Sequence, residues 1–396
     1  MEVLTSYVSQ PGVPLVRVRS RCEGNATVVD LEQTRFLLGS ERSPDQLWSI
    51  PVCFTDGACI VLRERTQSVR RSGCRDSVFP NDEGRGYYVT TLEPAAQTAL
   101  AGGRDLSPSE RMAFVRDQWL LVRAGSHSLD DYLQTATAFG NDRHVADQVL
   151  TTLGYITRHR VDGAREERLQ TLLRQLATPI LSDLGWSVRP GDTREDLELR
   201  NKVIELLGDH AADTATRRRG RELTNRWLRD ANALSPEVVS DVARIAAIGG
   251  DAKLYAAFLK GYRTNSDPNQ KLRFLSLLGA FRDPQLLRRT LQLTLTDEIR
   301  GQDLASVLAG VIGNPAGRDI AWRFLNENWS AIERKLPPGH TGRVLTALSA
   351  NACDPVWQER IRQFTAEHPM PQSERAVRVA IERIGNCVEL RALQGG

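Results

Sequence analysis

The chain has 396 residues, of which 41% are hydrophobic and 26% charged, so its length and composition fit a protein of two or more folded domains. Its 52 basic and 49 acidic residues leave a net charge of only +3. The densest basic cluster, at 217–221, has acidic neighbours, which favours a solvated helix face over a nucleic-acid footprint. No apolar run approaches the roughly 20 residues that span a bilayer. We therefore expect neither nucleic acid nor a membrane as a partner.

Short strands are predicted in the first hundred residues. The apolar and β-branched runs with turn residues between them are at 13–19, 26–31, 47–54, 58–62 and 87–92. Strands of this length at this spacing are typical of a small β-sandwich, which we place at residues 12–100. Residues 1–11 lack the basic and apolar regions of a signal peptide.

Helix starts replace the strands after residue 100. Ser107, Pro108 and Glu110 form a predicted capping box. Further Asx, Ser or Thr starts, most followed by proline, recur near 192, 235, 267, 283, 314 and 354. Helix pairs at intervals of this size predict an all-α superhelical domain of HEAT or armadillo type at residues 101–396. The expected fold class is thus a β-sandwich followed by a large helical-repeat domain.

One of these helices has an unusual aromatic face. Asn314 fits the N-cap and Pro315 the first helical position. The residues that then recur at helical spacing, and that we expect to be buried, are Ala321, Leu325, Trp329 and Ile332. The spacing therefore predicts that this helix is packed into the core.

The same segment carries a resemblance to a family. Residues 313–329 resemble the Asn-Pro-x-Gly-x-x-x-Ala-Trp-x-Phe-x-x-x-Asn-Trp run in the C-terminal helical domain of gluzincin zinc aminopeptidases, the group of aminopeptidase N and puromycin-sensitive aminopeptidase. The elements at 10–16, 32–36, 48–51 and 86–89 look like segments of that family's β-sandwich domain, although Val89 stands where Arg is common. Arg111 and Asp117 match two positions of a further helical segment. The resemblance covers residues 5 to 390, and it implies that residues 1–11 are the tail of a missing catalytic domain.

The residues that perform catalysis in this family have no counterpart here. A zinc site of this kind needs His-Glu-x-x-His, but none of the six histidines is followed by Glu. The Gly-x-Met-Glu-Asn loop is also absent, because the only Met-Glu pair is Met1-Glu2. We predict no catalytic residues, no metal ligands and no cofactor in this chain, and interpret its histidines as surface or capping groups. Zinc would belong to the catalytic domain of the parent family.

The six cysteines include no Cys-x-x-Cys pair, which excludes a zinc ribbon. At this density and length a disulfide framework is not expected, although a bridge within the first hundred residues stays open. The compartment is left open, with a soluble cytoplasmic protein favoured over a periplasmic or secreted one. Oligomeric state and substrate preference cannot be deduced.

The resemblance implies a non-catalytic C-terminal portion of a zinc aminopeptidase. Such a portion covers the active site, restricts access and contacts the distal part of the peptide, so its partners would be its own N-terminal catalytic domain and peptides. The chain alone is predicted to be inactive as a hydrolase. Candidate residues for a peptide carboxylate are Arg343, Lys253 and Tyr255. The alternative is a free-standing helical-repeat protein-interaction module.

Overall fold

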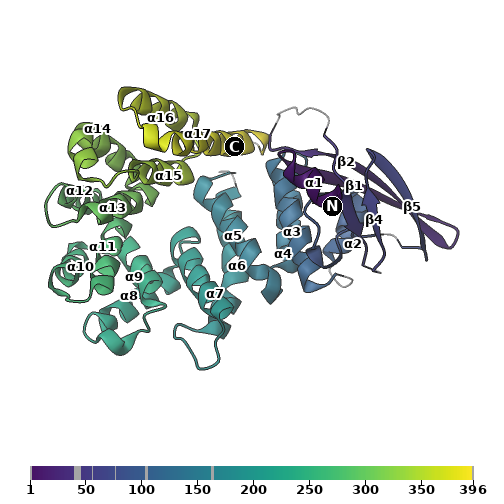
Figure 1. The fold of residues 1–396 in the computed structure, drawn as a ribbon. Coiled ribbons are helices and arrows are strands. Elements are labelled where there is room, and N and C mark those ends of the chain that lie inside the picture. The colour runs from purple at the N-terminus through teal and green to yellow at the C-terminus, as the bar shows by residue number, and fades with distance from the viewer. Residues whose placement is uncertain are drawn as a thin grey trace. The chain divides into compact units, whose positions relative to one another are not determined.

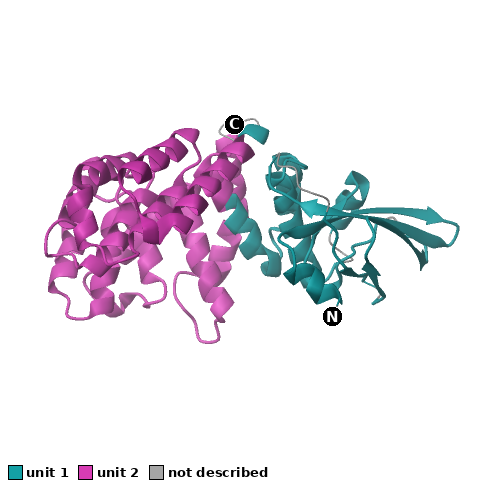
Figure 2. Cartoon of the chain, turned by 45° about the horizontal axis from the view of Figure 1, so that its top comes forward, with its two compact units in different colours: residues 1–153, 392–395 teal, residues 154–391, 396 magenta. Residues whose placement is uncertain are grey.

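The computed structural model describes residues 2–39, 46–55, 57–75, 77–102, 106–161 and 165–394 (Figure 1). Met1, the first residue of the predicted N-terminal tail, and residues 395–396, the last two of the predicted helical domain, lie outside this set. The chain divides into two compact units (Figure 2). Unit 1 contains residues 1–153 and 392–395, and unit 2 contains residues 154–391 and 396.

Unit 1 contains the strands in two sheets. A four-stranded sheet has the order β5-β2-β1-β6, and a second sheet pairs β3 with β4. Strands β1 and β6 are parallel, and the other neighbours are antiparallel. The bounds are β1 Val13–Glu23, β2 Ala26–Phe36, β3 Ile50–Cys53, β4 Cys59–Leu62, β5 Thr66–Ser72 and β6 Val89–Leu92. This confirms the predicted β structure.

Strand β5 was missed from the sequence. Its residues, TQSVRRS, alternate between exposed and half-buried, and none is fully buried. A strand at the edge of a sheet needs no apolar face of its own when its partner β2 supplies the hydrogen bonds. Because hydrophobic periodicity is the main sequence signal for a strand, β5 could not be recognised from the sequence.

A buried glutamine joins the two sheets. Gln33 in β2 has no exposed surface. Its Oε1 accepts from the backbone N–H of Trp48 at 2.9 Å, and its Nε2 donates to the carbonyls of Trp48 at 3.0 Å and Glu64 at 3.1 Å. These groups flank β3 and β4, so one side chain fixes the second sheet against the first.

Helix α3 of unit 1 starts where the sequence predicted. The α3 N-cap Ser107 accepts from the backbone N–H of Glu110, whose carboxylate accepts from that of Ser107, which confirms the capping box. Asp117 on α3 is buried and accepts from the N–H of Thr90 in β6 at 2.9 Å, which ties helix to sheet. The helices are α1 Glu2–Val8, η1 Asp82–Gly84, α2 Pro94–Ala101, α3 Pro108–Arg123, α4 Leu129–Phe139 and α5 Arg143–His159, the last of which ends in unit 2.

The described residues of unit 2 form helices and the turns that connect them, with no strand. The helices follow one another along an arc from α6 to α17 (Figure 1). Aspartates cap α10, α11, α12 and α16, as the proline-associated signals predicted for three of them. In chain order the elements are α6 Glu166–Leu184, α7 Arg194–Glu205, η3 Leu206–His210, α8 Thr214–Trp227, η4 Ala231–Ala233, α9 Val239–Ile248, α10 Ala252–Thr264, α11 Pro268–Leu277, η5 Leu278–Ala280, α12 Pro284–Leu293, α13 Gly301–Gly313, α14 Arg318–Lys335, α15 Thr341–Asn351, α16 Pro355–Glu367, η6 Pro371–Ser373 and α17 Glu374–Leu393.

The aromatic helix is confirmed, but its start is not where we predicted. The buried residues of α14 are the four that the spacing selected. However, α14 begins at Arg318, with Gly317 at the N-cap. Asn314 instead lies in a turn, where its amide donates to the carbonyls of Gly279 at 2.9 Å and Phe281 at 2.6 Å. A buried asparagine that holds a neighbouring helix end has the same sequence signature as a cap.

The expectation of no disulfide framework was wrong, whereas bridges within the first hundred residues, a possibility left open, do form. All six cysteines form disulfides, namely Cys22–Cys74 and Cys53–Cys59 in unit 1 and Cys353–Cys387 in unit 2. Their partners come from separate segments of the chain, so the Cys-x-x-Cys test could not find them. Disulfides persist mainly in oxidising compartments, which removes the reason for preferring the cytoplasm.

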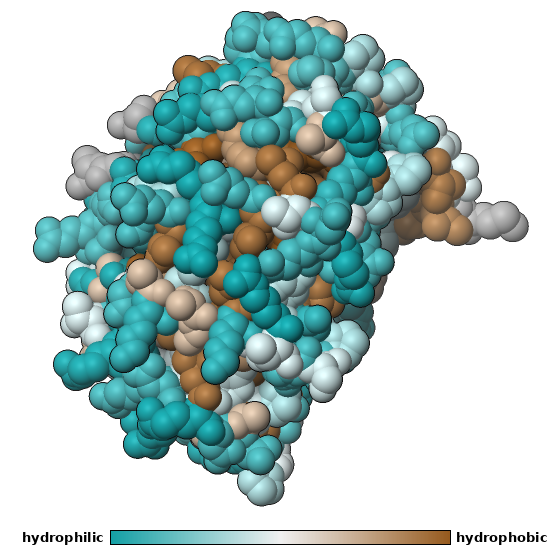
Figure 3. Space-filling view, turned by 90° about the vertical axis from the view of Figure 1, so that its left-hand side faces the viewer, coloured by the Kyte–Doolittle hydropathy of each residue, from teal (hydrophilic) through white to brown (hydrophobic). Residues whose placement is uncertain are grey.

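One face of unit 2 mixes hydrophilic and hydrophobic side chains. On the side of α10, α12 and α14, hydrophilic side chains form ridges with hydrophobic ones between them (Figure 3). The arginines of α8 are partly paired, Arg219 with Glu222 and Arg221 with Asp251, which agrees with a solvated helix face. Among the described helices, none is both long and apolar enough to cross a membrane.

Candidate binding cavity

Unit 2 contains a cavity of about 950 Å³ on its inner face. Its walls come from the end of α5, from η3, α9 and η5, and from the turns before α14 and α16. Seven arginines and five carboxylates line it, which gives a formal charge of +2 with both histidines neutral. A positively charged recess of this size suits an anionic group on an extended ligand.

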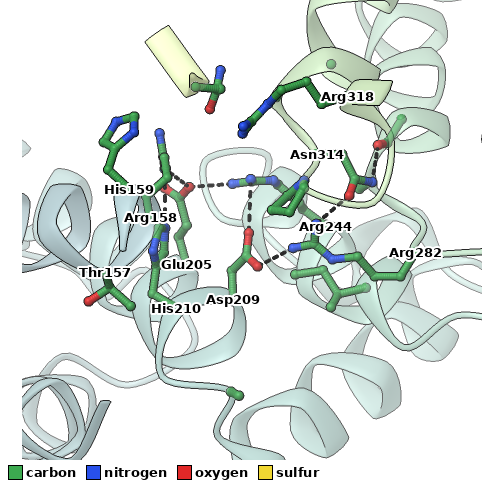
Figure 4. Close-up of a pocket in the computed structure, with 18 of the residues that line it drawn as sticks. Thr157, Arg158, His159, Glu205, Asp209, His210, Arg244, Arg282, Asn314 and Arg318 are labelled. Carbon is green, nitrogen blue, oxygen red and sulfur yellow. Dashed lines mark hydrogen bonds and ion pairs between the residues drawn. The ribbon is translucent and has the colours of Figure 1, made fainter. Parts of the chain in front are cut away.

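An ordered network of charges forms one wall (Figure 4). Glu205 pairs with Arg244 and, at 3.4 Å, with Arg158. Asp209 pairs with Arg244 at 3.3 Å and with Arg282. The guanidinium of Arg282 also donates to the side-chain oxygen of Asn314, the residue that was predicted to be a helix cap. Two carboxylates thus hold three arginines in fixed positions.

Arg318 also lines the cavity, but it does not take part in this network. It begins α14, and Figure 4 shows its side chain extending into the cavity. Its Nε is buried and has no hydrogen-bond partner among the described residues, and its guanidinium makes no ion pair there. Burial lowers its pKa below the usual range. A desolvated cation with spare donors is a binding site for an anion.

The cavity also shifts the pKa values of its carboxylates and histidines. Burial followed by the charge of Arg158 lowers the pKa of His159 to about 4, and the same two causes lower that of His210 to about 4. Burial alone would raise the pKa of Glu205, but Arg244 and Arg158 outweigh it and the net shift is downward. Asp241 has its pKa raised to about 6, first by burial and then by Glu205.

The two cavity histidines correct the interpretation of histidines as surface groups. His159 is only 7% exposed, and its neutral ring carries a buried Nδ1 without a partner among the described residues. It was missed because a lone histidine at a helix end has no distinctive spacing. Arg318 directly follows the family-like Asn-Pro-x-Gly turn, so its place next to that motif was a signal that could have been used.

The three predicted peptide-binding residues lie elsewhere. Tyr255 is fully buried in the core of unit 2, where its hydroxyl hydrogen-bonds to that of Thr290 at 3.0 Å. Lys253 and Arg343 are exposed, on α10 and α15 respectively. None of the three lines the cavity. Their contact with a peptide stays a prediction.

The residues present do not fit the zinc of an aminopeptidase. Within the described part of the chain, the one group of His, Cys, Asp or Glu side chains with metal-ligand proximity is His159 with Cys353 and Cys387. Those two cysteines form a disulfide, and no general base accompanies them in a His-Glu-x-x-His motif. No hydrolytic step can be derived through a zinc ion here.

Comparison with known proteins identifies the family. The model of the ERAP1-like C-terminal domain matches residues 77–386. Aminopeptidase 2 of Candida albicans is 25% identical over 385 residues, which cover 93% of this chain and 41% of the relative. Endoplasmic reticulum aminopeptidase 2 of Bos taurus is 25% identical over 368 residues, or 85% of this chain and 37% of the relative. The chain therefore spans less than half the length of the curated relatives it matches, and it belongs to the family of ERAP1-like C-terminal domains, as found in aminopeptidase N-like enzymes.

Proposed function

We propose that this chain is the non-catalytic C-terminal portion of a zinc aminopeptidase and that its cavity holds the distal, carboxylate end of a peptide. In the full enzyme it would cover the active site and restrict access. The relatives named aminopeptidases support the family, and the missing zinc motif supports a non-catalytic role. The cavity in unit 2 supplies a recess with an excess of cationic side chains.

Arg318 is the observation that carries the proposal. Its neighbours Arg244 and Arg282 both pair with Asp209, so they have fewer free donors to offer a ligand. The guanidinium of Arg318 can donate two parallel hydrogen bonds to a carboxylate, which is the geometry that arginine favours. A peptide carboxylate placed there would give the buried Nε the partner it lacks.

The direct test compares peptides with a free and an amidated C-terminus. Binding to the purified chain is measured by fluorescence anisotropy with a label at the peptide N-terminus. We expect the free acid to bind more tightly by about tenfold or more, since a charged hydrogen bond contributes about 1.5–3 kcal/mol. Arg318→Met should remove this difference, whereas Arg323→Met, at an exposed position of the same helix outside the cavity, should retain it.

Each part of the proposal has a result that would contradict it. Equal affinity for the acid and the amide would show that no carboxylate is bound. A free-acid preference that survives in Arg318→Met would move the site to another residue. Hydrolysis of an aminoacyl-arylamide by the purified chain would contradict the non-catalytic role separately. Saturable binding of a folded protein but of no peptide would favour the interaction-module alternative.

A further inference from the structure

The Cys353–Cys387 disulfide lies beside a histidine at the place where the two ends of unit 2 meet. His159 is the last residue of α5, Cys353 lies between α15 and α16, and Cys387 is within α17. The two sulfur atoms and a ring nitrogen of His159 are all within 4.8 Å of one another, and all three residues are buried. Neither of the other two disulfides has such a histidine among the described residues.

We propose that the reduced form of this cluster is a metal site, in which the thiolates of Cys353 and Cys387 and a ring nitrogen of His159 bind a Zn²⁺ ion. Two sulfur ligands and one imidazole are a donor set that zinc favours. Two thiolates would balance the charge of the ion. The fourth position would be open to the cavity, which both His159 and Cys353 line.

The geometry requires a limited rearrangement. Zn–S bonds of about 2.3 Å and Zn–N bonds of about 2.0 Å at tetrahedral angles place ligand atoms about 3.5–3.8 Å apart. The three ligand atoms now lie within 4.8 Å of one another, and the two sulfur atoms, which are bonded in the disulfide, must move apart once it is reduced. The ring of His159 is already held in place by Tyr155, whose ring centroid lies 4.4 Å away.

The environment of His159 and Cys353 also favours metal binding by their side chains. His159 has a buried Nδ1 with no partner among the described residues, so an electron pair is available in the neutral ring. Arg391 donates to the backbone carbonyl of Cys353 at 2.9 Å, which fixes the segment that carries this cysteine.

The chemistry balances with a phosphine as reductant. The phosphine and one water molecule become the phosphine oxide, and the disulfide becomes two thiols. Both thiol protons are released when the metal binds. The same three chain segments would then be joined by a metal ion in place of the disulfide.

The test uses the full chain, reduced with a phosphine that is then removed under anaerobic conditions. Titration with Co²⁺ should produce thiolate-to-cobalt charge-transfer bands and the visible bands of a tetrahedral ion, and excess Zn²⁺ should abolish both. In the unreduced chain neither set of bands should appear. The reduced chain should also melt at a higher temperature with Zn²⁺ than without it.

Two variants separate this site from the other reduced cysteines. Cys22→Ser/Cys74→Ser removes a pair without a neighbouring histidine and should leave the cobalt spectrum unchanged. His159→Asn should weaken Co²⁺ binding by more than about tenfold, because even the loss of a residue that only orients a ligand costs that much. If both variants bind Co²⁺ as tightly as the wild type, the proposal is wrong.

Zinc-edge X-ray absorption of the reduced wild-type chain removes any dependence on variant folding. We expect two sulfur and at least one imidazole ligand per bound zinc. A shell of oxygen and nitrogen only, or of four sulfurs, would overturn the assignment.

Discussion

Gln33 in unit 1 and Arg318 in unit 2 show two different uses of a polar side chain inside a protein. Gln33 is fully buried and every polar atom of its amide is engaged with backbone groups. Arg318 is half-buried, and its guanidinium has no hydrogen bond or ion pair within the described residues. The first arrangement fixes strands relative to one another, whereas the second leaves donors for a ligand. The difference separates a structural polar group from a binding one.

The longer-range disulfide of unit 2 and the short Cys53–Cys59 disulfide of unit 1 should differ most strongly in the stability they contribute. Cys353–Cys387 closes 34 residues and Cys53–Cys59 only 6. Chain-entropy arguments give about 4 kcal/mol for the longer loop and about 2 kcal/mol for the shorter one. Scanning calorimetry of Cys353→Ser/Cys387→Ser and Cys53→Ser/Cys59→Ser should show the larger loss in unit 2. A smaller loss there would mean that unit 2 is already constrained when unfolded.

Replacing Gln33 tests the structural role. Gln33→Leu leaves the N–H of Trp48 and the carbonyls of Trp48 and Glu64 without their partner. We expect the free energy of unfolding to fall by about 3 kcal/mol, because buried groups that lose their hydrogen bonds cost about 1–3 kcal/mol each. Urea denaturation measures this loss. Gln285→Leu, at an exposed position, is the control and should change little.

Asp117 in unit 1 and His159 in unit 2 should contribute to the pH dependence of stability with opposite signs. Burial raises the pKa of Asp117 in unit 1 to about 6, so the folded state holds a proton that the unfolded state lacks between pH 6 and 4. Stability from this group therefore rises as the pH falls through that window. The pKa of His159 in unit 2 is lowered to about 4. Below pH 6.5 the unfolded state binds its proton first, so this group removes stability as the pH falls.

Single variants measure each contribution. Melting temperatures of Asp117→Asn and His159→Asn at pH 4 and pH 7 are compared with the wild type. Between pH 7 and pH 4, Asp117→Asn should lack the stabilisation that the wild type gains from Asp117. His159→Asn should lack the destabilisation that His159 causes. Each difference corresponds to at most about 3 kcal/mol in the free energy of unfolding. Parallel curves for all three proteins would show that neither group has a shifted pKa.

Sequence patterns predicted the elements whose signals are local. The Ser107 capping box, the buried stripe of Ala321 and Trp329, and the division into β and α regions were all confirmed. What failed depends on distant partners. The disulfides join cysteines up to 52 residues apart, and β5 owes its place to β2. The role of Asn314 is set by carbonyls more than 30 residues away.

The cavity could not be predicted for the same reason. Its residues come from segments that the sequence separates widely, and the superhelix brings them to one inner face. An excess of arginine occurs along the whole chain, so composition cannot select the arginines that face a cavity. Arg282 has Asp209 and Asn314 as partners, whereas Arg318 has neither a carboxylate nor an amide partner among the described residues, and this difference exists only in the folded unit.

Replacing Arg282 or Arg318 with methionine should have the smallest effect on the free energy of unfolding. Arg282→Met deprives Asp209 and Asn314 of a partner and should lower the free energy of unfolding by about 2 kcal/mol. Arg318→Met removes a partly buried cation without an ion pair among the described residues. Its effect should lie between no change and a gain of about 1 kcal/mol, because desolvating an unpaired charge is unfavourable. Urea denaturation of the two variants decides the matter: if Arg318→Met lost as much stability as Arg282→Met, Arg318 would be a structural residue, and its donors would not be available to a ligand.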